Sequence, residues 1–116
     1  PAAKQRRGDW WVVFPSLAVE IFPDQLDLFV VRPTGPETCV EEILVYFVGD
    51  GATASEYATA RQHVLDNWNA LNAEDLGLIE RMQRGRHSPG FDGGVLSPFW
   101  DGYVGHLSRL VLDGVA

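Results

Sequence analysis

The stretch NWNALNAEDLGLIERMQRG, residues 67–85, decides how the chain folds. Apolar side chains recur in it and just before it at spacings of three and four, as in a helix with one buried face. The members of this stripe are Val64, Leu65, Trp68, Leu71, Leu78, Ile79 and Met82. Asp75 falls within the stripe, so a continuous helix would direct its carboxylate toward the core. Because a buried carboxylate needs a cation, a metal, several donors or a proton, Asp75 is the candidate functional residue.

Three interpretations of Asp75 arise from its neighbours. In the first, a new helix begins at Asn72, and Glu74 and Asp75 lie in its first turn, where the helix dipole stabilises acidic groups. In the second, Asp75 pairs with a buried cation such as Arg81, Arg84 or a histidine. In the third, Asp75 binds a metal ion. The residues alone leave all three open.

The composition predicts one acidic domain. A chain of 116 residues with 46% hydrophobic content can form one modest core. The net charge of -7 argues against nucleic acid as the main partner, and no apolar run is long enough to span a bilayer. The single cysteine, Cys39, permits no internal disulfide and suits a reducing cytoplasm, and we expect it to be buried and inert.

Four strand-like segments precede the helical stretch. Residues 10–22, WWVVFPSLAVEIF, are rich in β-branched and aromatic side chains, and Pro15 divides them into two strands. A third strand is expected from Leu26 to Arg32, and the longest from Cys39 to Val48. Because this last segment is apolar on both faces, we expect it to be a central strand.

Two helical segments come after the strands. The first is expected from about Ser55 through residues 67–85, either continuous or restarted at Asn72. The second is expected to begin at Ser97-Pro98, an N-cap followed by proline at the first helical position. Strands followed by helices predict an α+β domain, with a curved antiparallel sheet, helices on one face and a long C-terminal helix.

Neither the histidine spacings nor the motifs of known catalytic nucleophiles identify an activity in this sequence. His63, His87 and His106 lack the short spacings that place two imidazoles on one metal ion, so a structural or solvated role is favoured for each. The sequence has no Gly-x-Ser-x-Gly elbow and no glycine-rich phosphate loop.

Several short motifs, taken together, carry a resemblance over nearly the whole chain. They are Phe14-Pro15-Ser16-Leu17, the turn Arg32-Pro33-Thr34-Gly35-Pro36, Glu74-Asp75, Glu80, Gln83-Arg84-Gly85, Ser88, Gly94, Leu96-Ser97-Pro98 and His106. In this order they resemble the C-terminal part of the α subunit of Rieske-type ring-hydroxylating oxygenases. The combination is fairly specific, although each motif alone is weak.

The resemblance implies a fold and an iron site. The family's catalytic domain has a helix-grip fold, similar to START and Bet v 1-like proteins, with an apolar pocket between the sheet and a long C-terminal helix. A mononuclear Fe(II) is held there by two histidines and one aspartate. By its position in the motif, Asp75 is that aspartate and hence the expected metal ligand and catalytic residue. Trp68 and Leu71 are candidates for the substrate pocket, although Trp68 also suits core packing.

The resemblance further implies a larger protein. The family's Rieske cluster (2Fe-2S) and its two iron-binding histidines lie upstream of the segment that this sequence matches. Residues 1–116 are therefore expected to be the C-terminal part of a catalytic domain, inactive alone. The full-length protein is expected to be a cytoplasmic mono- or dioxygenase and a homo-oligomer. It would hydroxylate an aromatic or other organic substrate with O2, in aromatic compound catabolism, with electrons from a ferredoxin or reductase.

Two alternatives stand beside this interpretation. One is a non-catalytic helix-grip module that binds an apolar small molecule. The other is a fragment whose role is assembly, because an open sheet edge can pair with another copy.

Overall fold

A computed structural model describes residues 7–116 of the chain. The chain divides into two compact units, Pro1–Gly77 and Leu78–Ala116. The first unit holds the sheet and most of the long helix, and the second holds the end of that helix and the C-terminal helix.

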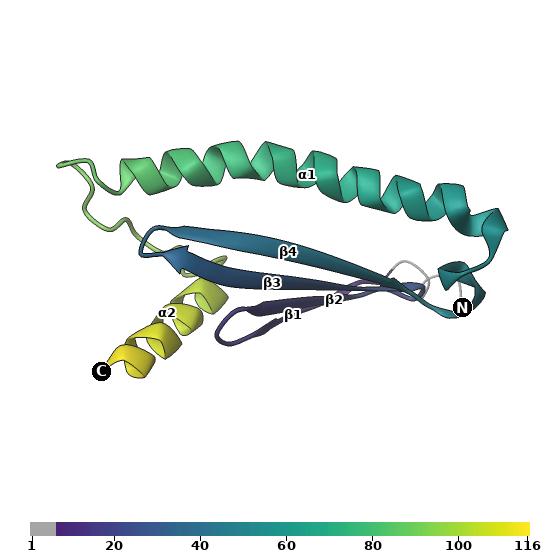
Figure 1. Cartoon of the computed structure of the whole chain (residues 1–116). Coiled ribbons are helices and arrows are strands. Elements are labelled where there is room, and N and C mark those ends of the chain that lie inside the picture. Colours follow the sequence, from purple (N-terminus) through teal and green to yellow (C-terminus); the bar gives the residue numbers. More distant parts are fainter. Residues whose placement is uncertain (1–6) are drawn as a thin grey trace. The chain divides into compact units, whose positions relative to one another are not determined.

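The sheet of the first unit is antiparallel and has the order β1-β2-β3-β4, so each strand pairs with its neighbour in sequence (Figure 1). The strands are β1 Asp9–Val13, β2 Leu17–Ile21, β3 Gln25–Gly35 and β4 Thr38–Phe47. The turn between β1 and β2 contains Pro15, which follows a cis peptide bond, and the turn between β2 and β3 contains Pro23 and Asp24. The α+β class with an antiparallel sheet is thus confirmed.

One expectation about the sheet is wrong. β4 lies at the end of the sheet of the described residues rather than in its centre. Apolar side chains on both faces of a strand indicate that other elements cover those faces. The position of a strand in the sheet depends instead on backbone pairing along the two edges of the strand. Cys39 is exposed instead of buried; it pairs with Pro33 close to the turn of the hairpin that β3 and β4 form.

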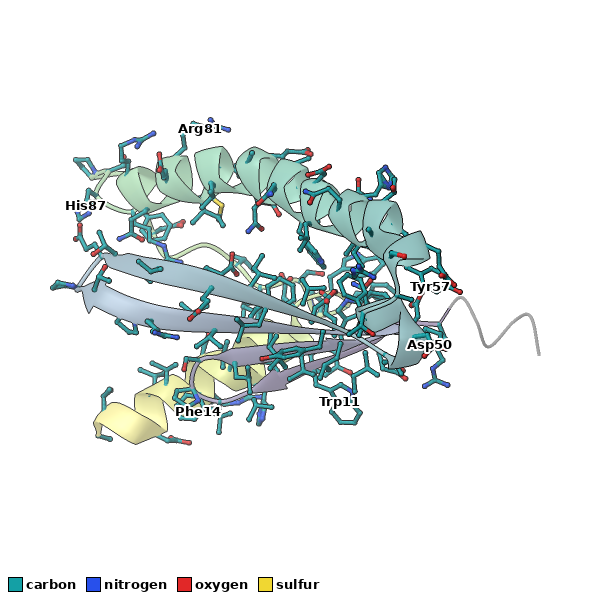
Figure 2. All side chains as sticks on the ribbon, turned by 45° about the vertical axis from the view of Figure 1, so that its right-hand side comes forward. Trp11, Phe14, Asp50, Tyr57, Arg81 and His87 are labelled. Carbon is teal, nitrogen blue, oxygen red and sulfur yellow. The ribbon has the colours of Figure 1, made fainter. Side chains whose placement is uncertain are left out.

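Alternation along the strands separates two faces of the sheet. Glu20 on β2, Asp27 on β3 and Val45 on β4 lie in one cross-strand row and therefore share a face. Trp11 of β1 belongs to the other face, and Figure 2 shows its side chain pointing away from α1. The row that contains Asp27 is the one that meets the long helix.

The long helix, α1, spans Ala58–Gly85 and is continuous, so no second helix begins at Asn72 as one interpretation of Asp75 required. Two short 3-10 turns, η2 Gly49–Ala52 and η3 Ser55–Tyr57, precede it. Arg61 ties this entry to the helix, because its Nη1 donates to the carbonyl oxygens of Gly51 at 2.8 Å and Ala54 at 3.0 Å.

The half-buried face of α1 in the first unit differs from the predicted stripe. Arg61, Val64, Trp68 and Asn72 are half-buried, with helical spacings of three and four. Several apolar members of the predicted stripe are exposed: Leu65, Leu71, Leu78, Ile79 and Met82. Sequence spacing identified the periodicity, but the half-buried face includes two polar residues, Arg61 and Asn72, beside Val64 and Trp68.

The second unit contains the end of α1, a loop and α2, Gly102–Val115. The prediction that the last helix begins at Ser97 is wrong by one turn. Ser97 Oγ accepts hydrogen bonds from the backbone N–H groups of Phe99 at 3.3 Å and Trp100 at 3.2 Å, so it caps a turn before the helix. Asp101 precedes the first helical residue and accepts from the Ser97 N–H at 2.7 Å.

Candidate functional site: a buried carboxylate and the helix it contacts

The buried polar group of the first unit is Asp27, in the middle of β3. Its side chain is 0% exposed, and of residues 7–116 it alone is fully withdrawn from solvent. Oδ2 accepts hydrogen bonds from Gln25 Nε2 at 2.6 Å and Trp68 Nε1 at 3.2 Å. Oδ1 is buried and has no hydrogen-bond partner. A carboxylate in such a place is costly unless it takes up a proton.

A second acidic group lies directly opposite. Glu20 on β2 is the register partner of Asp27. Burial raises the pKa of Asp27, and the hydrogen bonds from Gln25 and Trp68 offset only part of the rise. Burial also raises the pKa of Glu20, a hydrogen bond from Trp10 lowers it, and the charge of Asp27 raises it further. Both environments therefore favour the protonated carboxyl over the carboxylate.

Trp68 connects this carboxyl to α1. Its indole N–H donates to Asp27, and its ring meets Phe29 edge-on, with centroids 5.1 Å apart and planes at 77°. One turn further along the helix, Asn72 Nδ2 donates to Glu41 Oε2 on β4 at 3.4 Å. The sheet thus contacts successive turns of the same face of the helix.

Asp75 lies on the continuation of that face. It follows Trp68 by seven residues and Asn72 by three, spacings that place all three side chains in one stripe. The Asp75 side chain is exposed in the described chain, so the expectation that the helix alone would bury it is wrong. The stripe passes beyond the hydrogen bond between Asn72 and the sheet before it reaches Asp75, which accounts for the exposure.

The other predicted residues differ in their surroundings. Trp68 packs against Phe29 and Asp27, which is the packing role that its sequence context also suited. Leu71 is 48% exposed. Arg84, one of the cations considered for Asp75, lies 3.9 Å from Glu80 in the second unit.

The donor atoms of the described residues do not complete an iron site. Within residues 7–116, no group of three or more His, Cys, Asp or Glu side chains is placed to hold a metal ion. His63, His87 and His106 are exposed. An accessible carboxylate such as Asp75 has the donor chemistry of one ligand in a site of two histidines and one carboxylate.

The sequence did not single out Asp27. The segment LDLFVVR alternates like an ordinary strand, and a polar residue in such a pattern suits a solvated face. Asp27 is buried because Trp68, far along the chain, contacts it. The available signal was the acidic residue on the same face as Phe29 and Val31, which are apolar.

Comparison with known proteins identifies the family. A family model described as ring hydroxylating alpha subunit (catalytic domain) matches residues 1–116. The chain therefore belongs to the family of catalytic domains of ring-hydroxylating α subunits, enzymes that are oxygenases and generally use non-haem iron. No curated protein and no solved structure matches the chain.

Within the described residues, no helix is both long enough and apolar enough to cross a bilayer.

Proposed function

We propose that the chain forms part of the catalytic domain of a Rieske non-haem iron oxygenase and supplies one iron ligand, the carboxylate of Asp75. The observation that carries this proposal is the family match over residues 1–116, within which the Glu74-Asp75 motif occupies the helix that the sheet contacts. The two histidine ligands and the Rieske cluster come from residues outside this chain.

The exposed apolar surface supports a role within a larger domain. No apolar side chain of residues 7–116 is fully buried, and large ones such as Trp10 and Trp11 are more than half exposed. Isolated domains seldom expose so many large apolar side chains, so other parts of a catalytic domain would cover them. We propose that residues 1–116 are the C-terminal part of such a domain.

The function of the bound iron would be oxygen chemistry. Two histidines from the rest of the domain and Asp75 would hold the ion, which would supply O2 activation beside a substrate. Asp75 would hold the metal and offset part of its charge. Leu71, one turn before Asp75, has an accessible apolar side chain and is the better of the two pocket candidates, since Trp68 is engaged by the sheet.

The substrate would be an aromatic or other organic molecule, hydroxylated by mono- or dioxygenation. Electrons would come from a ferredoxin or reductase through the Rieske cluster, in the cytoplasm, and the full-length protein would be a homo-oligomer. These features rest on the family alone.

The proposal is tested by the gene sequence upstream of the codon for Pro1. We expect a Cys-x-His and Cys-x-x-His cluster motif, followed by two histidines separated by four or five residues. A native reading frame that starts within a few codons of Pro1 would contradict the proposal. It would favour a ligand-binding or assembly module, which would bind apolar molecules or oligomerise without iron.

A further inference from the structure

We propose that Asp27 and Trp68 form a positioning pair that sets the rotation of α1 on the sheet and thereby places Asp75 for iron binding. The inference rests on the proposed function, because it takes Asp75 as the iron ligand. It adds a role for the buried carboxyl group of Asp27, which accepts side-chain hydrogen bonds from Gln25 and Trp68.

Trp68 and Asp75 share one face of one helix. Seven residues correspond to nearly two full turns, so the two side chains differ by about 20° around the axis and by about 10 Å along it. Both residues belong to the first unit, and α1 is continuous between them. A rotation of the helix at Trp68 is therefore transmitted to Asp75.

This face of the helix is fixed by directional contacts. Apolar packing alone would tolerate small rotations, whereas a hydrogen bond weakens steeply as its angle departs from linear. The indole N–H of Trp68 points to Asp27 Oδ2, and the edge-on contact with Phe29 limits the ring from a second side. Asn72 and Glu41 add a weaker contact, a hydrogen bond of 3.4 Å that is open to solvent.

Metal binding tolerates little movement of Asp75. Side chains extend about 5–6 Å from the axis of a helix, so a rotation of about 20° would move the Asp75 carboxylate by about 2 Å. Metal–ligand distances are fixed to within about 0.2 Å. Even a modest loosening of α1 would therefore be expected to weaken iron binding.

The hydrogen-bond pattern requires an accepting oxygen at Asp27. Both donors use the same oxygen, Oδ2, while Oδ1 remains without a partner. A neutral carboxyl can make both bonds, because its carbonyl oxygen has two lone pairs and accepts from both donors. An asparagine would reproduce the accepting oxygen, whereas a leucine of similar size would not accept at all.

The experiment measures the dissociation constant of Fe(II) in the full-length protein, by competition with a chelator. Changes to groups that orient metal ligands usually weaken metal binding by about 10–100-fold. We expect a weakening of about tenfold or more for Asp27→Leu and for Trp68→Phe, which keeps a ring against Phe29 but lacks the N–H. We expect Asp27→Asn to bind Fe(II) within about threefold of wild type, as a rescue by the conservative variant.

Two controls separate positioning from general destabilisation. Leu28→Ala lies on the opposite face of β3 and should lower stability without weakening Fe(II) binding by the folded protein. The double variant Asp27→Leu/Trp68→Phe should bind Fe(II) no more weakly than the weaker single variant, because both changes remove one interaction. Trp68→Phe is a mild change and tests the proposal even if Asp27→Leu does not fold.

The outcomes are distinguishable from those of the proposed function. If Trp68→Phe and Asp27→Leu bind Fe(II) like wild type while Asp75→Ala loses it, the positioning role is wrong and the proposed function stands. If Asp75→Ala also binds Fe(II) like wild type, both fail. Weak Fe(II) binding by Asp27→Asn would likewise overturn the role of Asp27 as a neutral hydrogen-bond acceptor.

Discussion

Glu20 and Asp27 lie directly opposite each other on β2 and β3, two carboxyl groups on the face of the sheet that meets α1. The pKa of each is raised, chiefly by burial, and the charge of Asp27 contributes to the rise at Glu20. A pair of this kind holds protons more tightly in the folded protein than in the unfolded chain. The stability of the domain must therefore depend on pH in a defined direction.

The first prediction is that stability falls as pH rises above about 4. The ordinary pKa of an aspartate is about 3.9, and the folded value is higher, so the folded state binds more protons between these two values. The contribution of Asp27 is fully present below about pH 3.9 and is lost as pH rises through its folded pKa. The measurement is the free energy of unfolding at a series of pH values.

Asp27→Asn should flatten this dependence, because it removes one titrating group and the charge that raises the pKa of Glu20. Asp24→Asn is the matched control, since Asp24 is exposed in the turn between β2 and β3. If the slope of unfolding free energy against pH is unchanged in Asp27→Asn, or is flattened equally in Asp24→Asn, the buried carboxyl of Asp27 is not the source of the pH dependence.

The second prediction concerns the entry to α1. Arg61→Ala removes the donor to the carbonyl oxygens of Gly51 and Ala54, and hydrogen bonds from charged groups contribute about 1.5–3 kcal/mol. We expect a loss of about 1–2 kcal/mol and faster amide exchange in residues 49–57, measured by hydrogen–deuterium exchange. Arg81→Ala, at an exposed position of the same helix, should change stability by less than about 0.5 kcal/mol. Equal exchange rates in wild type and Arg61→Ala would contradict this role.

The third prediction concerns the turn before α2. Ser97→Ala leaves the N–H groups of Phe99 and Trp100 without their acceptor, and the loss of such a cap costs about 1 kcal/mol. Ser108→Ala is the control: Ser108 Oγ donates to the Val104 carbonyl oxygen, a bond that contributes little to a helix. The measurement is amide exchange of residues 97–105 in both variants. Faster exchange in Ser108→Ala than in Ser97→Ala would contradict the assignment of Ser97 as the cap.

The strands could be predicted from the sequence because their signals are local. β-branched and aromatic runs interrupted by Pro15, Pro23 and Gly35 mark strands and turns within a few residues of where the structure has them. The start of α2 was misplaced because a Ser-Pro pair suits a capped turn as well as a helix start. A capped turn and a helix start differ only in the residues that follow the Ser-Pro pair. Here Asp101 follows the turn and precedes the first helical residue.

The buried carboxyl could not be predicted because its environment is assembled by distant residues. Asp27 has the sequence pattern of a strand residue on a solvated face. Its buried environment arises only in the folded chain, where Trp68 on α1 and Glu20 on β2 lie next to it. Asp75 is the opposite case. Helical spacing placed it on the stripe of Trp68, a face that in the structure includes Asn72 instead of Leu71, but the described residues leave the Asp75 side chain exposed.

The role of Asp75 as an iron ligand is decided by one quantity, the iron content per chain of the full-length protein. Asp75→Ala should lose iron and turnover together. Glu74→Ala, which removes the same charge one position earlier and about 100° away around the helix, should retain both. Full iron content in Asp75→Ala, or equal loss in the two variants, would contradict the role of Asp75.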